Sequence, residues 1–190
     1  SEMCIRDRFW TSRTTPNGLA FPLATVALTH VVHGRHAYKG LALLAATAMM
    51  LRLELVCLAV PAYLWTWWHH QRRFVYVFMT GAVTCAGSIA LSVLVDSYFW
   101  RKRFLWPEGH AAIFNVIEGR SAEWGVSPPW TYVVRDLPRI LFAAFPLALL
   151  GCTRRSSFRS PLVLLICTHV GLMSFLAHKE WRFLVYIVPL

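Results

Sequence analysis

Residues 74–95 form a run of 22 amino acids without a single Asp, Glu, Lys or Arg. A helix of that length is about 33 Å long, enough to cross the roughly 30 Å hydrocarbon core of a bilayer. Arg73 precedes the run and Asp96 follows it. We therefore predict that residues 74–95 cross a membrane as one helix and that Asp96 ends it.

The composition supports an integral membrane protein. Charged residues make up 15% of the chain and hydrophobic residues 57%, with a mean hydropathy of +0.49, whereas soluble domains carry about a quarter charged residues. The net charge of +10 comes from basic residues in short clusters between apolar runs. That placement follows the positive-inside rule and differs from a nucleic-acid groove. We expect membrane lipid, and no nucleic acid, as a partner.

Further apolar runs predict an all-α, polytopic fold with about six or seven apolar segments. They are residues 19–32, broken by Pro22, and residues 41–51, 55–68, 137–152 and 161–177. The runs 41–51 and 55–68 are each too short to cross a bilayer and flank Arg52 and Glu54. These two charges are expected below the lipid surface, either as a pair that fixes helix packing or as part of a polar cavity.

Charge in the connections predicts the topology. The connectors 69–73 and 153–160 together hold five Arg and no Asp or Glu. The long connection 96–136 holds five acids and five bases. The Lys/Arg bias places the first two connectors in the cytoplasm. The connection 96–136 and the segment 178–183 then lie together on the opposite side.

The cysteines and residues 1–8 give little information about fold or function. The number of cysteines is five, most of them within apolar runs, so neither a disulfide framework nor a metal site is indicated. Residues 1–8 are expected to be a non-native leader, and residues 9–190 a partial transmembrane domain. We interpret the chain as a fragment of a larger polytopic protein.

The segment 178–183 places four ionisable side chains within six residues: His178, Lys179, Glu180 and Arg182. Lys179 and Arg182 can hold an anion, and a carboxylate among them can orient those cations. A charged helix end at the membrane surface would have the same composition. Both readings stay open on residue types alone.

The connection 96–136 interleaves aromatic side chains with carboxylates, Asn and Arg. Rings can cover the apolar faces of a sugar while polar groups bind its hydroxyls. Segments at a membrane surface use the same residue types.

Three strings resemble a eukaryotic family of endoplasmic-reticulum mannosyltransferases that use dolichyl-phosphate mannose, glycosyltransferase family 22. The strings are DSYFWRKRFLWPEG at 96–109, FNVIEGRSAEWGVSPPWTYVVRDLPR at 114–139 and HKEWRF at 178–183. The last carries the family's HKE-x-RF signature. The stretch SRTTPN at 12–17 and the Arg52–Glu54 region also fit. The loop strings are most similar to the branch that adds α-1,6-linked mannose to the lipid-linked oligosaccharide.

The resemblance implies a GT-C-type helical bundle, multi-pass in the endoplasmic-reticulum membrane, with a luminal loop 96–136 and a luminal motif 178–183. It implies inverting transfer of mannose from dolichyl-phosphate mannose, without metal or cofactor, to a dolichol-linked oligosaccharide acceptor. The catalytic carboxylate is expected upstream of this chain, so neither Asp96 nor Glu108 is assigned that role. Expected donor-phosphate ligands are His178, Lys179, Glu180, Arg182 and Arg52. Candidates for the acceptor or the loop structure are Asp96, Trp100, Glu123 and Trp124.

Two alternatives remain from the sequence. A sister enzyme could add α-1,2-linked mannose to the N-glycan precursor or to the GPI anchor. A polytopic transporter or flippase could lack transferase activity, but it would need charges inside most spans. Here the charges concentrate at the predicted luminal ends.

Overall fold

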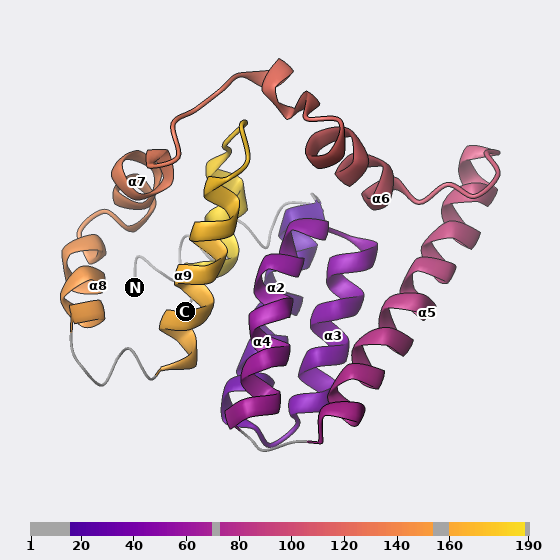
Figure 1. Cartoon of the computed structure of the whole chain (residues 1–190), viewed down its shortest axis with the longest axis horizontal. Coiled ribbons are helices and arrows are strands. Elements are labelled where there is room, and N and C mark those ends of the chain that lie inside the picture. Colours follow the sequence, from indigo (N-terminus) through magenta and orange to yellow (C-terminus); the bar gives the residue numbers. More distant parts are fainter. Residues whose placement is uncertain (1–15, 70–72, 154–159, 189–190) are drawn as a thin grey trace. The chain divides into compact units, whose positions relative to one another are not determined.

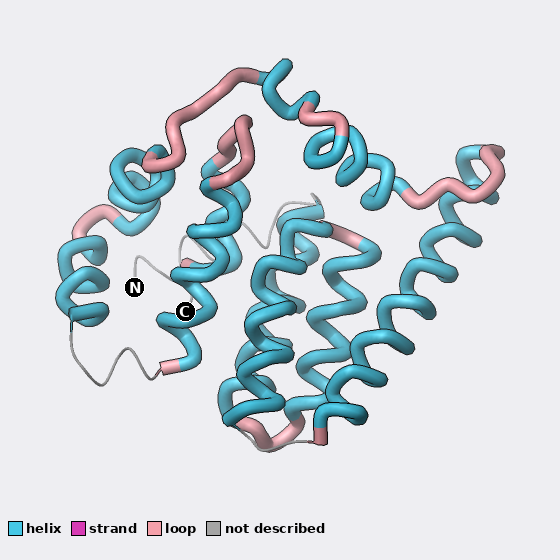
Figure 2. The backbone as a smooth tube through the Cα atoms, viewed as in Figure 1, coloured by secondary structure: helices cyan, strands magenta, loops and turns pink. Residues whose placement is uncertain are grey.

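A computed structural model of the chain describes residues 16–69, 73–153 and 160–188. The expected leader 1–8 and most of the two basic connectors, 70–72 and 154–159, lie outside the described residues. Within those ranges the chain is helical and contains no strand (Figure 2). The all-α prediction is confirmed for this part of the chain. The chain divides into two compact units, Ser1–Ala112 and Ile113–Leu190, so the division falls inside the predicted loop 96–136.

The first unit is a bundle of helices packed against one another (Figure 1). Its long helices are α2 (Pro16–His33), α3 (Ala37–Met50), α4 (Val56–His69) and α5 (Phe74–Trp100). α3 packs against each of the other three. The core between them is built from small and aliphatic side chains that are almost fully buried: Ala20, Ala24, Ala27, Leu28, Val31, Leu41, Leu44, Ala48, Leu58 and Ala62. Small residues allow helix backbones to approach closely, as is common between membrane helices.

Helix α5 is the one described helix that is long and apolar enough, by length and composition, to cross a membrane. It has 27 residues and continues to Trp100, so the prediction that Asp96 ends it is wrong. Asp96 stays within the helix because Ser92 Oγ, one turn earlier, donates a hydrogen bond of 2.7 Å to its carboxylate. Only 17% of the most apolar window of α5 is buried within the protein, which leaves most of that surface to other surroundings.

The break between the two short helices lies where the sequence predicts it. α3 and α4 have 14 residues each, and the 3-10 turn η1 (Leu53–Leu55) joins them just after Arg52. The expected break at Pro22, in contrast, is wrong, because α2 runs through that residue. A proline inside a helix costs about 3 kcal/mol. Burial of the adjacent Phe21 and Ala24 in the core offsets that cost.

The second unit consists of short helical elements. They are η2 (Ile113–Ile117), η3 (Arg120–Trp124), η4 (Tyr132–Asp136), α7 (Leu137–Leu141), α8 (Ala144–Thr153), α9 (Pro161–Ser174) and η6 (Trp181–Ile187), while α6 (Pro107–Ala112) closes the first unit. α9 packs against η4 and η6, and α7 also packs against η6. The buried side chains at these contacts are Tyr132, Leu165, Val170, Met173, Leu184 and Tyr186.

Residues 137–152 do not form the single spanning helix that their hydropathy predicts. The chain turns at Phe142, which has a positive φ of 49°, and separates α7 from α8. In a continuous helix, Pro146 would clash with the carbonyl of Phe142 and leave it without a donor. The turn instead places Pro146 in the first turn of α8, where a proline is tolerated.

The packing of α2 against α3 depends on Gly40. A Cβ at this position would lie 2.5 Å from the carbonyl oxygen of Ala27, whereas a Cβ at Gly87 in α5 would meet nothing within 4 Å. We expect Gly40→Ala to destabilise the fold by about 1–3 kcal/mol, because the two helices must move apart. Gly87→Ala should leave stability unchanged or slightly raised, since alanine favours helix. The melting midpoints of both variants in detergent measure the difference, and equal midpoints would contradict the proposed contact.

Candidate functional site

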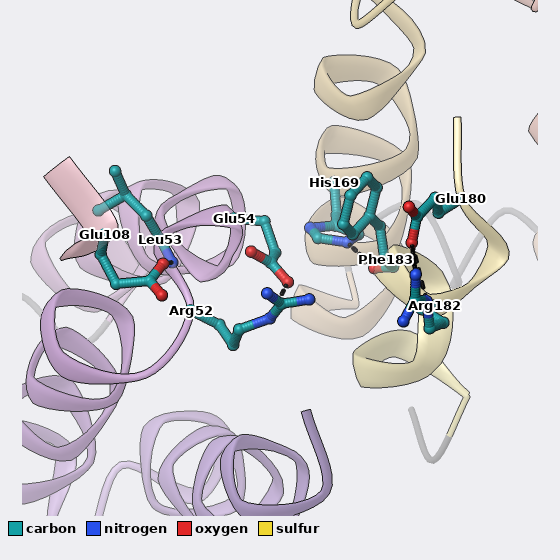
Figure 3. A network of polar contacts seen from close by, with 8 residues as sticks. All are labelled: Arg52, Leu53, Glu54, Glu108, His169, Glu180, Arg182 and Phe183. Atoms are coloured by element: carbon teal, nitrogen blue, oxygen red, sulfur yellow. Dashed lines mark hydrogen bonds and ion pairs between the residues drawn. The ribbon is translucent and has the colours of Figure 1, made fainter. Parts of the chain in front are cut away.

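The motif 178–183 lies in the second unit, at the junction between α9 and η6. α9 ends at Ser174, and η6 begins at Trp181 with an apolar run whose residues 184–187 are buried. His169, fully buried in α9, places Nε2 2.7 Å from the carbonyl oxygen of Phe183 (Figure 3). The apolar segments on both sides are thus fixed in the protein, and the polar motif occupies the turn between them.

Glu180 contacts two neighbouring side chains, Arg182 and His178. Its Oε2 accepts a hydrogen bond of 2.8 Å from Arg182 Nε, and its Oε1 lies 3.3 Å from His178 Nε2 (Figure 3 shows the pair with Arg182). The other nitrogen of His178, Nδ1, lies 3.3 Å from the carbonyl oxygen of Gly125. An imidazole can donate to both acceptors only when both nitrogens carry a proton. The ring of His178 is thus held between Glu180 and the backbone of Gly125.

Arg182 keeps donors for a further acceptor. Its side chain is 53% exposed, and its Nη2 also contacts Glu180 Oε2. A guanidinium has five N–H donors in a fixed plane, so a carboxylate that takes two of them leaves others for a second anion. The arrangement can therefore hold Arg182 in one orientation while it binds a phosphate-like group.

Lys179 is in a different position from its neighbours. It is only 6% exposed, and its Nζ donates hydrogen bonds to the carbonyl oxygens of Leu176, at 2.6 Å, and Ser127, at 3.1 Å. Burial lowers the pKa of this ammonium group. Ser127 N in turn donates to the carbonyl oxygen of Ala177 at 3.0 Å. Lys179 thus ties residues 125–127 to the motif, and its expected contact with a donor phosphate stays a prediction.

The loop candidates have partners of their own. Glu123 accepts a hydrogen bond of 2.7 Å from Arg120 Nε, and that bond holds the pKa of the carboxyl below its usual value. The guanidinium of Arg120 also lies over the ring of Phe114, 4.4 Å from its centroid. Both charged side chains are about half exposed. Trp124 ends η3, and its side chain lies outside the described part of the structure.

In the first unit, Arg52 forms an ion pair of 2.9 Å with Glu54 at the α3–α4 break (Figure 3). Glu108 Oε2 accepts a hydrogen bond of 2.9 Å from the backbone N–H of Leu53, and Trp106 Nε1 donates to the carbonyl oxygen of Met49 at 3.0 Å. The start of the connection 96–136 is thereby docked on the break. The ion pair is compatible with helix packing and with a polar cavity, as the sequence left open.

The structure brings together part of the expected site. His178 and Arg182 each contact Glu180, and Lys179 joins the motif to residues 125–127. Arg52, Asp96 and Trp100 belong to the first unit and have separate surroundings there. Sequence reasoning missed the backbone acceptors of Gly125 and Ser127, for which residue types give no signal. It also missed His169, although a histidine inside an apolar run could have been noticed.

No group of three or more His, Cys, Asp and Glu side chains that could hold a metal occurs among the residues the structure describes. The donor types that are present, a guanidinium and an imidazole beside a carboxylate, suit an anionic ligand. The expectation that transfer needs no metal or cofactor stays a prediction.

Comparison with known proteins identifies the class of protein. The Alg9-like mannosyltransferase family matches residues 8–190, and the chain belongs to that family. The resemblance that the three sequence strings indicate is thus confirmed. No solved structure matches the chain.

The most similar relatives point to one branch of the family. A Schizosaccharomyces pombe protein is 36% identical over 80% of this chain and 28% of its own length. Relatives from Drosophila melanogaster and Saccharomyces cerevisiae are 34% and 33% identical over 95% of this chain, and 26% and 33% of their own lengths. All three bear the name Dol-P-Man:Man(7)GlcNAc(2)-PP-Dol alpha-1,6-mannosyltransferase, the first with the word "probable" before it. The chain thus spans a third or less of the length of these relatives.

We predict that Lys179→Met loosens the contact between residues 125–127 and the motif. The substitution keeps an apolar stem but leaves the carbonyls of Ser127 and Leu176 without their donor, which costs about 1–3 kcal/mol. Amide hydrogen exchange at residues 125–127 should accelerate by about tenfold. Lys102→Met, at an exposed lysine, is the matched control and should leave this exchange unchanged. Unchanged exchange in Lys179→Met as well would show that the ammonium does not hold the loop.

Proposed function

We propose that the protein transfers mannose from dolichyl-phosphate mannose to the lipid-linked oligosaccharide Man(7)GlcNAc(2)-PP-Dol, forming an α-1,6 linkage in the membrane of the endoplasmic reticulum. The family match over residues 8–190 and the names of the three relatives support the reaction and the acceptor. The observation that carries the proposal within the chain is the HKEWRF motif, in which a half-exposed Arg182 is oriented by Glu180.

The transfer of mannose from a phosphate donor requires a binding site for an anion. The acceptor hydroxyl oxygen attacks the anomeric carbon of the mannosyl phosphate, and the bond from that carbon to the phosphate oxygen breaks with inversion. The electron pair leaves with dolichyl phosphate, and the hydroxyl proton passes to a carboxylate base. Because negative charge grows on the leaving phosphate, cationic donors aimed at it stabilise the transition state more than the ground state.

We assign the residues of the motif different roles in binding the phosphate. Arg182 binds the phosphate with the donors that Glu180 does not occupy. His178 becomes the second donor when the phosphate replaces the carbonyl oxygen of Gly125 as the partner of its ring. Glu180 orients both of them. Lys179 positions residues 125–127, and its direct contact with the phosphate stays a prediction. Arg52 remains a weaker candidate for the phosphate, because it is paired with Glu54.

The surroundings of Asp96 and Glu108 do not support either carboxylate as the catalytic base. Asp96 accepts a hydrogen bond from Ser92, and Glu108 accepts one from the backbone of Leu53. Both serve local structure, so the base is assigned to neither. Glu123, paired with Arg120, and the exposed Trp100 remain candidates for acceptor contacts or for the shape of the loop.

The finer architecture is part of the proposal: a multi-pass GT-C-type bundle in which loop 96–136 and motif 178–183 face the lumen. Three contacts support a common compartment for the second half of the loop and the motif. These contacts join Ser127 to Ala177, Lys179 to Ser127, and His178 to Gly125. Segments in direct hydrogen-bond contact are expected on the same side of a bilayer, which supports this part of the proposal.

The reaction can be tested in microsomes that contain the full-length protein as their only source of the activity. With dolichyl-phosphate mannose and Man(7)GlcNAc(2)-PP-Dol, we expect one added mannose that an α-1,6-specific mannosidase removes. Growth of a GPI precursor, or an α-1,2 linkage, would instead identify a sister enzyme. Movement of lipid-linked sugar across the membrane without any transfer would identify a transporter.

The phosphate site is tested by Arg182→Ala in the same full-length protein. Hydrogen bonds between charged groups contribute about 1.5–3 kcal/mol, so transfer should fall by about 10- to 150-fold while the protein still inserts and accumulates. Arg35→Ala, at an exposed arginine outside the motif, is the matched control and should retain normal transfer. Normal affinity of Arg182→Ala for the donor would exclude Arg182 from the phosphate site.

A further inference from the structure

A short turn at the end of α5 has a fixed shape and an unusual charge. Residues 101–104, here called the basic turn, follow Trp100, the last residue of the helix long enough to cross a membrane. Arg101 and Phe104 both have positive φ, at 51° and 55°. Such values are uncommon outside glycine. The backbone N–H of Leu105 donates a hydrogen bond of 2.9 Å to Ser97 Oγ. This bond holds the basic turn against the C-terminal end of α5.

The three charges of the basic turn have no ion-pair partner among the residues that the structure describes. Arg101, Lys102 and Arg103 are consecutive and exposed, and no carboxylate among the described residues forms an ion pair with them. The nearest acids along the chain are Asp96, hydrogen-bonded to Ser92, and Glu108, hydrogen-bonded to the backbone of Leu53. Arg52, Arg120, Arg135 and Arg182 each have a carboxylate partner, whereas Arg35, Arg73 and Arg139 form no ion pair among the described residues. The basic turn is therefore a concentrated positive charge that can accept an anionic ligand.

Exposed aromatic rings surround these charges. Tyr98, Phe99, Trp100 and Phe104 are 78%, 76%, 67% and 84% exposed. Tyr98 and Phe99 contact each other edge to face, with 5.3 Å between ring centroids. Large rings in water are unfavourable, whereas rings at the level of lipid headgroups are stabilised by the apolar phase beneath them. The combination of rings and cations suits a lipid with a charged phosphate better than a free anion, which would engage the cations alone.

We propose that the basic turn is a binding site for the phosphate of anionic lipid headgroups, in the leaflet that surrounds the C-terminal end of α5. Arg101, Lys102 and Arg103 bind the phosphate oxygens, and the rings of Trp100 and Phe104 lie against the acyl boundary. The site goes beyond the proposed transferase function and uses only one part of it, the location in a membrane. It would hold the end of α5 at a defined depth in the bilayer.

The test uses the full-length protein in phosphatidylcholine nanodiscs that contain a trace of photoactivatable lipid, either phosphatidic acid or phosphatidylcholine. The labelled residues are mapped by peptide mass spectrometry. Each basic residue near an anionic surface raises lipid affinity on the order of fivefold. We therefore expect phosphatidic acid to label residues 97–106 at least fivefold more than phosphatidylcholine does. The combined variant Arg101→Gln, Lys102→Gln and Arg103→Gln should lose this preference.

Two variants separate charge from folding. Arg101→Lys with Arg103→Lys keeps the charge and should keep the preference. The matched control, Arg35→Gln with Lys39→Gln, removes exposed charges elsewhere and should also keep it. Equal labelling by the two lipids would overturn the proposal, as would competition by millimolar inorganic phosphate, which would show a site for free phosphate. Failure of the protein to enter nanodiscs would overturn its membrane premise, whereas loss of mannose transfer alone would concern only the proposed reaction.

Discussion

A buried ammonium group organises the second unit of this protein. Lys179 is almost inaccessible to water, and a charge in that position is stable only when acceptors surround it. Two backbone carbonyls, from Leu176 and Ser127, supply them. Because Ser127 lies 52 positions earlier in the chain, this requirement brings the later part of the long connection to the motif. The contact between Ser127 N and Ala177 then completes the attachment.

The contact between residues 125–127 and the motif explains why neighbouring charged side chains of the motif lie in different surroundings. With Lys179 directed inward, His178, Glu180 and Arg182 remain at the surface of the turn, where Glu180 joins the other two. His169 and the buried residues of η6 fix the apolar segment that follows. A partly exposed guanidinium on a rigid support can bind a developing anion with little reorganisation. The site thus derives its orientation from burial on either side of it.

In the first unit, hydrogen bonds between side chains and the backbone also attach the connection 96–136 to helices. Glu108 accepts the N–H of Leu53, and Trp106 donates to the carbonyl of Met49, so the start of the long connection is held at the break between α3 and α4. Gly109 makes room for this arrangement, because a Cβ there would collide with the ring of Trp106. In the first unit, side chains of the connection thus satisfy backbone groups at the ends of helical elements, Leu53 N and Met49 O. These backbone groups have no partner within their own helix.

The sequence alone determined the helical class, the long apolar helix α5, the interruption at Arg52 and the identity of the polar motif, because hydropathy and residue type are local properties. Tertiary structure decided the features that depend on contacts between distant residues. Packing kept α2 continuous through Pro22, and a turn at Phe142 divided the expected span around Pro146. The structure also gave Lys179 its partners. They are main-chain carbonyls, which every residue possesses, so only the folded chain determines which of them a buried cation meets.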